Sequence, residues 1–362
     1  MASKKLVYAL PKDYARTTGG FIYNERLVGE LTKLGWDVAR LDLPTGFPTP
    51  SADAKRRTAE CFAALPEGAL VLSDQLCLSV LPDLVRSQRR RMKLVIIVHH
   101  PLALEGYDLE APGGLMHLEA GSLRNAALVI ATSATTSRTL ISEYAIDAGR
   151  IVVAPPGTDP QTPAVGNPGQ TAKVLSVGAV VPRKGHDLLV RALADISDLA
   201  WQAVIVGNLT RAPRHVSMLR QLISSLSLGS RLELAGELTT CEVESEWSSA
   251  DVFVSASRHE GFGMAVSEAM ARGLPVVTTH AGAVGDRLSA ETCCVVPSGD
   301  AEALARALRR VLADTSFRAR LRDAARSYSL GQPGWDHTAR IVDSRLGLLA
   351  PAGSDRGCDL AC

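Results

Sequence analysis

Two glutamates stand eight positions apart in the segment EGFGMAVSE, which runs from Glu260 to Glu268. The β-branched run Val252–Ser255 precedes this segment, and a helical pattern over Met264–Arg272 completes it, so it predicts a strand, a loop and the start of a helix. The two glycines of the segment allow a ligand to approach the backbone, and the free amides at a helix start suit a phosphate. A carboxylate about one turn into the helix can accept hydrogen bonds from vicinal hydroxyls, such as those of a ribose. Taken alone, Glu268 is equally typical of an acidic residue favoured by the helix dipole.

A second group of polar residues lies between the predicted strand Val174–Val177 and the predicted helix Asp187–Ile196. Arg183 and Lys184 stand there beside a glycine, directly before the helix. Two cations next to a helix N-terminus suit a diphosphate. Without further context, such loop charges are more often simply solvated.

Two further candidates fall in the first half of the chain. Gly19 and Gly20 lie at the start of a predicted helix, where their amides could meet a phosphate, although a plain glycine turn is the better explanation when they are taken alone. His99 and His100 follow the strand Leu94–Val98, and Glu105 comes five residues later. A histidine at the carboxyl end of a strand can bond a sugar hydroxyl or move a proton, or it can simply cap a loop.

The elements that must position these residues alternate along the whole chain. Strands are predicted over Lys5–Leu10, Val38–Leu43, Ala69–Ser73, Leu94–Val98, Leu128–Thr132, Ile151–Ala154, Val174–Val177, Ala203–Val206, Leu232–Ala235, Val252–Ser255, Val276–Thr278 and Cys294–Val296. Helical patterns separate most of them, over Gly20–Leu34, Ala52–Leu65, Leu78–Arg90, Ser137–Tyr144, Asp187–Ile196, Val216–Leu226, Cys241–Ser249, Met264–Arg272, Ala301–Ala313, Phe317–Tyr328 and Trp335–Leu346. This alternation predicts parallel sheets covered by helices on both faces.

A break in composition divides the chain. The run Pro155–Gly169 holds five prolines and three glycines, which excludes a helix or a central strand. We therefore predict an α/β protein with two doubly wound, Rossmann-like domains facing across a cleft. The first domain covers residues 1–157, a linker covers 158–171, and the second domain covers 172–330. A C-terminal helix is placed in residues 331–350, and residues 351–362 form a polar tail predicted to be disordered.

The segment Ser257–Thr278 resembles the E-x7-E signature of family 4 glycosyltransferases with the GT-B fold, and the likeness extends over nearly the whole chain. It implies that Glu268 binds the donor ribose and that Glu260 lies beside the donor sugar. The resemblance also assigns the sugar hydroxyls and the phosphate to the loop between them, through the backbone of Gly261, Phe262, Gly263 and Met264.

The same resemblance extends to the other candidates. Lys184 matches a phosphate-binding lysine of the family. Ala179 stands where many members have an arginine, and Arg183 is its proposed substitute. The resemblance places Gly19 and Gly20 opposite the donor phosphate and His99 beside the donor sugar. His100 and Glu105 are assigned more weakly, to the acceptor. The family architecture also suggests that the C-terminal helix crosses back to the first domain.

Composition and short motifs argue against several other classes of function. The net charge of +1 over 362 residues argues against a nucleic-acid binder. No apolar run is long enough for a membrane span, and the N-terminus lacks a secretion signal, so a cytoplasmic protein is expected. The basic run Arg89–Lys93 is interpreted as a solvated helix end, with peripheral membrane contact less favoured. The seven cysteines show no zinc spacing, and no Asp-x-Asp occurs, so neither a metal nor another cofactor is predicted.

The expected function is a retaining glycosyltransferase that uses a nucleotide sugar without a metal ion. A UDP-sugar is favoured over a GDP-sugar, and the acceptor is left open. Two alternatives stay open as well. One is a GT-B sugar-nucleotide epimerase, and the other is a sugar-nucleotide-binding protein without catalysis.

Overall fold

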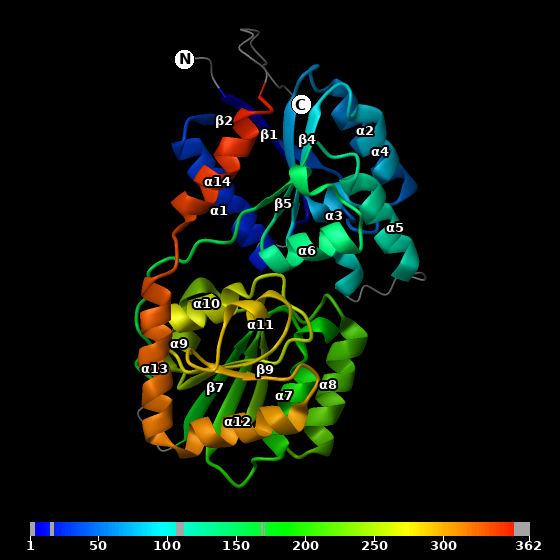
Figure 1. Ribbon diagram of the computed structural model, residues 1–362. Helices are drawn as coiled ribbons and strands as arrows, with labels where there is room; N and C mark the ends of the chain where they lie inside the picture. Colours follow the sequence, from blue (N-terminus) through cyan, green and yellow to red (C-terminus); the bar gives the residue numbers. More distant parts are fainter. Residues whose placement is uncertain (1–3, 15–17, 106–111, 168, 170, 351–362) are drawn as a thin grey trace.

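A computed structural model describes residues 4–14, 18–105, 112–167, 169 and 171–350. The chain forms two lobes, each built on a six-stranded sheet in which every described strand pair is parallel (Figure 1). The expected pair of doubly wound α/β domains is therefore confirmed. The predicted tail, 351–362, lies outside the described residues.

The first sheet has the strand order β2-β1-β3-β4-β5-β6. Its strands are β1 (Lys4–Pro11), β2 (Trp36–Leu43), β3 (Leu70–Asp74), β4 (Lys93–Val98), β5 (Leu128–Ala131) and β6 (Ile151–Val153). The helices between them are α1 (Gly19–Lys33), α2 (Ala52–Ala64), α3 (Gln75–Leu78), α4 (Pro82–Gln88), η1 (Leu102–Leu104), α5 (Pro112–Leu123), α6 (Ala134–Ser142) and η2 (Ala148–Arg150).

The second sheet has the strand order β12-β11-β10-β7-β8-β9. Its strands are β7 (Ala172–Val177), β8 (Trp201–Val206), β9 (Leu232–Gly236), β10 (Val252–Ser255), β11 (Val276–Thr279) and β12 (Cys294–Val296). The helices are η3 (Pro182–Lys184), α7 (His186–Ala194), α8 (Pro213–Ser225), α9 (Thr240–Ser249), α10 (Met264–Ala271), α11 (Ala283–Arg287), α12 (Ala301–Ala313), α13 (Thr315–Leu330) and α14 (Trp335–Gly347).

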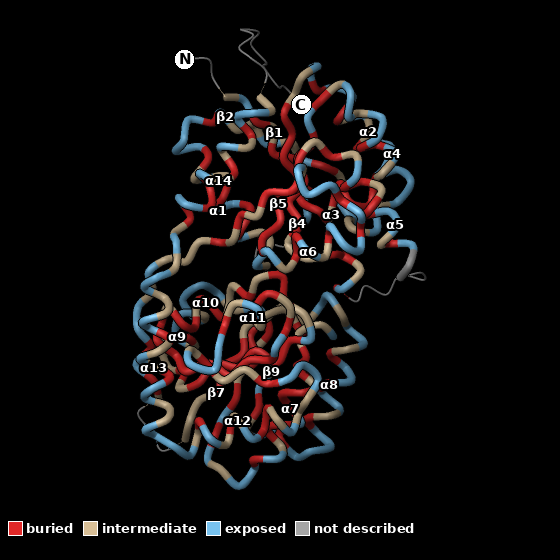
Figure 2. Tube along the Cα trace, in the orientation of Figure 1, coloured by how far each residue is buried: buried red, intermediate tan, exposed pale blue. Residues whose placement is uncertain are grey.

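Burial on both faces explains why the central strands are continuous apolar runs. In β4, each residue from Val95 to Val98 has no exposed surface, and Figure 2 shows buried residues concentrated along the sheets of both lobes. Helices cover both faces of a parallel sheet, so a polar side chain on either face would be removed from water at a cost in free energy. The apolar runs therefore fix the strands at the centre of each lobe.

Strand order also fixes where each sheet can bind a ligand. The chain leaves β1 for β2 on one side and returns to β3 on the other, and it reverses in the same way around β7, whose neighbours are β8 and β10. At such a point the loops after adjacent strands run in opposite directions and leave a crevice at the carboxyl ends. The expected crevices lie after β1 and β3 in the first domain, and after β7 and β10 in the second.

The last helix belongs spatially to the first lobe. The chain crosses between the lobes a second time after α13, and α14 packs against α1 (Figure 1). Tyr23 and Trp335 meet edge to face with ring centroids 5.6 Å apart, and Asp343 accepts hydrogen bonds from Trp36 Nε1 and Lys4 Nζ, each at 2.8 Å. The second crossing therefore ties the two domains together.

Three helices differ from the sequence-based expectation. The predicted helix Leu78–Arg90 begins later, as α4 at Pro82, because proline is favoured at the first position of a helix, and the separate short helix α3 ends at Leu78. Helix α5 was missed because its sequence, PGGLMHLEAGSL, is rich in glycine and has no amphipathic period. The short α11 is not among the helices expected from the sequence.

The packing of α14 makes a stability prediction with a matched control. Leu346 on α14 is fully buried, whereas Leu348, just beyond the helix, is 80% exposed. Leu346→Ala should lower the free energy of unfolding by about 2–5 kcal/mol, because it leaves a cavity between α14 and the first domain. Leu348→Ala should change it by less than about 0.5 kcal/mol. Urea denaturation of both variants tests this, and equal losses would contradict the packing.

Candidate active site

The loop after β7 carries the first two candidates. It forms the short helix η3, which ends in a left-handed glycine, Gly185, with φ of 63°. A Cβ at this position would overlap the carbonyl oxygen of Ala256, so the absence of a side chain lets the loop lie directly against the end of β10. The packing of this glycine therefore brings Lys184 next to the loop that carries Glu260.

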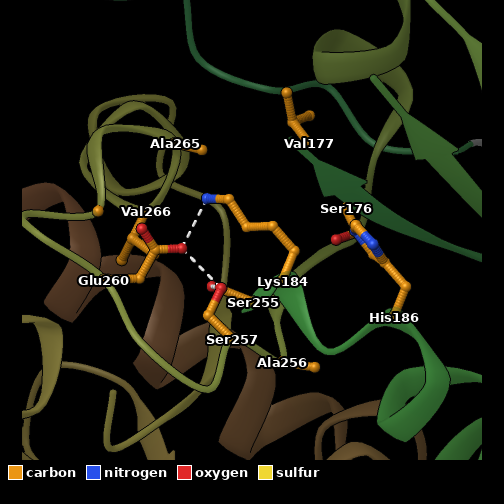
Figure 3. A pocket seen from close by; sticks show the side chains of 11 residues that line it. Ser176, Val177, Lys184, His186, Ser255, Ala256, Ser257, Glu260, Ala265 and Val266 are labelled. Carbon is orange, nitrogen blue, oxygen red and sulfur yellow. Dashed lines mark hydrogen bonds and ion pairs between the residues drawn. The ribbon is translucent and has the colours of Figure 1, made fainter. Parts of the chain in front are cut away.

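Lys184 and Glu260 form a partly buried ion pair at the switch point of the second sheet. Nζ lies 2.6 Å from Oε1 of Glu260, which also accepts a 2.6 Å hydrogen bond from Ser257 Oγ (Figure 3). Burial raises the pKa of Glu260, but the charges of Lys184 and Arg183 outweigh it and lower the pKa to about 2. The carboxylate is thus ionised at neutral pH.

A second left-handed glycine starts helix α10. Gly263 is its N-cap with φ of 89°, and a Cβ there would overlap the side chain of Val284. A residue with a side chain would be strained in this conformation and would not fit. The helix therefore begins directly after the EGFG turn, and Met264 is its first residue.

Glu268 lies inside α10 with no bound partner. Its carboxylate makes no hydrogen bond or ion pair to any other described residue. Burial raises its pKa to about 7; Glu244 and Asp159 add to the rise, while the charge of Arg272 opposes it. A half-buried carboxylate without a donor is what a ligand with paired hydroxyls would complete.

Phe262 plays a packing role in the same loop. The guanidinium of Arg287 lies 4.1 Å from its ring centroid and donates a 3.3 Å hydrogen bond to its carbonyl oxygen. Arg287 also donates to Ser267 on α10. This arginine, which the sequence did not single out, fastens the EGFG turn to the helix that follows it.

In the first domain, Gly20 and His99 are brought together at the β1/β3 switch point. A Cβ on Gly20 would lie 3.0 Å from Cδ2 of the His99 ring, so the glycine allows the ring to sit against the start of α1. The ring Nε2 lies 3.0 Å from Oδ2 of Asp74, the last residue of β3. Sequence reasoning missed Asp74, although its place at a strand end follows the rule that selected His99.

The two domains contact each other next to His99. A Cβ on Gly261 would overlap the carbonyl oxygen of His99, so backbone meets backbone across the cleft. A Cβ on Gly19 would be 3.8 Å from Sδ of Met264. Glycines selected from the sequence therefore lie where the two domains contact each other, which brings together candidates far apart in the chain.

Arg183 and Glu105 lie in an ion cluster between the domains. Arg183 Nε donates to Oε2 of Glu105 at 2.8 Å, Arg211 lies 3.3 Å from Oε1, and His100 bonds to Oε2. Burial opposes the charge of Glu105, but these groups hold its pKa well below the ordinary range. Arg183 also lies 3.5 Å from Oε2 of Glu260, so it links both carboxylates. Arg211 was not selected from the sequence, because it stands alone in the loop after β8.

Within the described part of the chain, no group of three or more histidine, cysteine, aspartate or glutamate side chains is placed to hold a metal ion. Among the same residues, no helix is long and apolar enough to cross a bilayer.

Two Rossmann-like domains whose switch points face each other define the GT-B class of glycosyltransferase folds. Solved structures with the same arrangement of domains support this classification of the fold. Sucrose-phosphate synthase from Thermosynechococcus elongatus superposes with a TM-score of 0.79 at 22% identity, covering 96% of this chain and 99% of that one. HepE from Anabaena, in complex with UDP and glucose, superposes with a TM-score of 0.76 at 17% identity, covering 95% and 100%.

Sequence comparison gives the finer assignment. Residues 158–328 match the family model of glycosyl transferases group 1, and residues 75–162 match that of glycosyltransferase family 4. The chain therefore resembles group 1 glycosyltransferases over residues 158–328 and has the GT-B fold. It is 29% identical over 284 residues to D-inositol 3-phosphate glycosyltransferase from Kineococcus radiotolerans, covering 71% of this chain and 64% of that one. It is 31% identical over 185 residues to the lipopolysaccharide core glycosyltransferase LpsE from Rhizobium meliloti, covering 51% of each. The chain spans 51% to 64% of the length of these relatives.

The low pKa of Glu260 predicts a defined dependence of stability on pH. Its folded pKa of about 2 lies below its ordinary value of 4.5, so its contribution is complete above pH 4.5 and is lost as pH falls towards 2. Glu260→Gln should therefore flatten the decline of stability in this window. The exposed Glu302→Gln is the control and should leave the wild-type slope. Urea denaturation at several pH values tests this, and an unchanged slope in Glu260→Gln would refute it.

Proposed function

We propose that this protein is a glycosyltransferase that moves a sugar from a nucleotide-sugar donor to an acceptor hydroxyl with retention of the anomeric configuration. The observation that carries the proposal is the position of the Lys184–Glu260 pair. It lies at the switch point of the second sheet, while Gly261 of the same loop meets the backbone of His99 in the first domain. Both domains therefore contribute polar groups to one cleft.

The diphosphate of the donor is assigned to the loop after β7 and the start of α10. Lys184 supplies a cation, and the free amides beyond Gly263 supply hydrogen-bond donors at a positive helix end. The leaving diphosphate gains negative charge as the bond to the sugar breaks, so these groups stabilise the transition state. In the unliganded chain Lys184 is balanced by Glu260, and the incoming diphosphate would share that cation.

Arg183 is the weaker diphosphate candidate. Its guanidinium already contacts Glu105, Glu260 and the carbonyl oxygen of His259. We propose that it acts on the donor as part of this cluster rather than as a free phosphate ligand.

The nucleoside is assigned to Glu268, whose unpartnered carboxylate would accept hydrogen bonds from both ribose hydroxyls. A UDP-sugar is the favoured donor. HepE, a structural neighbour, has been solved with UDP-glucose. That protein shares 17% of its sequence with this chain, so the likeness supports the fold directly and the nucleotide only as a proposal.

The sugar is assigned to the space between Glu260 and His99. The two residues come from different domains, so closure of the cleft would hold the sugar and exclude the water that would otherwise hydrolyse it. The acceptor oxygen would attack the anomeric carbon from the face that the diphosphate leaves. Retention follows from that geometry. His100 and Glu105 remain the acceptor-side candidates, at the edge of the interdomain cluster.

The ribose assignment makes a binding prediction. Glu268→Ala should weaken binding of the nucleoside diphosphate by about 1.5–3 kcal/mol, because a charged hydrogen-bond acceptor is lost. With a pKa of about 7, Glu268 ionises as pH rises from 6 to 8, so the difference from wild type should widen over that range. Calorimetry measures both effects. Glu302→Ala, in the first turn of α12, is the control, and equal affinity of wild type and Glu268→Ala would contradict the assignment.

The reaction itself is tested by a screen of nucleotide sugars. Donors are first ranked by the rise in melting temperature, and release of nucleoside diphosphate and product formation are then measured. Transfer should persist in EDTA, and NMR of the product should show the anomeric configuration of the donor. Loss of transfer in EDTA with recovery in Mg²⁺ or Mn²⁺ would refute metal independence, and an inverted product would refute retention. Epimerised donor without acceptor would favour an epimerase, and tight binding without turnover would favour a binding protein.

A further inference from the structure

Asp74 is a buried carboxylate that contacts His99, a residue of the proposed sugar site. It ends β3 at the switch point of the first sheet and has no exposed surface. Its Oδ2 accepts hydrogen bonds from Tyr14 Oη and Asn24 Nδ2, each at 2.7 Å, and lies 3.0 Å from His99 Nε2. Its Oδ1 accepts the backbone N–H of Leu76 at 2.8 Å. Every contact of this carboxylate is therefore with a group able to donate a proton.

The charge state of Asp74 determines which nitrogen of the His99 ring carries a hydrogen. Burial opposes ionisation, but the contacts with His99, Leu76 N–H and Asn24 outweigh it and lower the pKa of Asp74. An ionised carboxylate only accepts hydrogen bonds, so Nε2 of His99 must carry a hydrogen. In a neutral imidazole the lone pair is then on Nδ1.

The ring is also fixed in position. Gly20 lies against its Cδ2–Nε2 edge, Tyr23 meets it edge to face with centroids 5.3 Å apart, and the backbone N–H of His99 donates to Gln75 Oε1 at 2.8 Å. No described residue bonds to Nδ1, and this atom is not among the buried, unpaired polar atoms found in the described chain. The side chain is 15% exposed, so Nδ1 is the ring nitrogen left for a ligand.

We propose that Asp74 is a positioning residue for His99: it fixes the Nε2–H tautomer, so that Nδ1 is presented as a hydrogen-bond acceptor to a hydroxyl of the donor sugar. The inference rests on the proposed function for the identity of the ligand, but the tautomer itself does not depend on it. Asp74 contacts neither donor nor acceptor and acts only through the ring.

The wild-type protein gives the first test. In a ¹⁵N-labelled full chain at pH 8, two-bond ¹H–¹⁵N correlation should show His99 protonated at Nε2, with a slowly exchanging, downfield ring proton, and pyridine-like Nδ1. His99→Gln identifies the signals. A His99 ring protonated at Nδ1, or an Nε2 proton in fast exchange with water, would overturn the proposal without any variant of Asp74.

Asp74→Asn gives the second test. The Leu76 N–H needs an oxygen at the Oδ1 position, so the new amide NH₂ faces His99 and should move the ring hydrogen to Nδ1. The kcat for nucleoside diphosphate release should fall at least tenfold, while KM for the donor stays within threefold. Ser73→Ala is the matched control. It removes a buried 2.8 Å hydrogen bond to Ala9 one position earlier in β3 and should change neither the tautomer nor kcat.

Failure of this proposal and failure of the proposed function give different results. If Asp74→Asn keeps the Nε2–H tautomer, or switches tautomer but keeps the wild-type kcat, the positioning role is wrong while the transferase assignment stands. If the wild type turns over no nucleotide sugar but shows the Nε2–H tautomer that Asp74→Asn reverses, the transferase assignment fails and the assignment of the tautomer stands.

Discussion

The reversal of strand order beside β1 and β7 is the constraint on which the rest of the site depends. Parallel strands bury both faces, so polar groups can gather only at their carboxyl ends, and adjacent loops separate only where the order reverses. Lys184 and Glu260 follow β7 and β10, while Gly20 lies at the start of α1, after β1, and Asp74 ends β3. Each domain thus brings one pair of loops to the cleft.

Charge balance explains how such a site exists without a ligand. Buried ions are costly unless they are paired. Glu260 is neutralised by Lys184 and Arg183, and Glu105 by Arg183 and Arg211, with a further hydrogen bond to His100. The charge of Asp74 is stabilised by hydrogen bonds from its neighbours. Glu268 is the exception among these carboxylates, because it has no described partner and its pKa is raised instead. That contrast supports a hydroxyl-bearing ligand at Glu268 and a ligand that competes for cations at Lys184.

Backbone contact between the domains sets the distance between these charges. Gly261 has no side chain to hold the His99 carbonyl away, and Gly185 lets the lysine loop lie on the end of β10. Helix α14 returns to the first domain after the second has been completed, so the chain joins the lobes twice. The cleft is therefore defined by glycine positions and by this second crossing as much as by the charged side chains.

The sequence by itself determined the alternation of strands and helices, the two-domain α/β class and the loops that carry Lys184, Glu260 and His99, because periodicity and glycine placement are local properties of the chain. It also indicated the GT-B fold through the Glu260–Glu268 segment. Only the tertiary structure decided which residues pair with one another in the site. Arg211 meets Glu105 across 106 positions, and Asp74 meets His99 across 25, and no local pattern encodes such pairings. Helix α5 likewise lacks a periodic signal and is formed by packing, since tertiary burial can override weak local propensity.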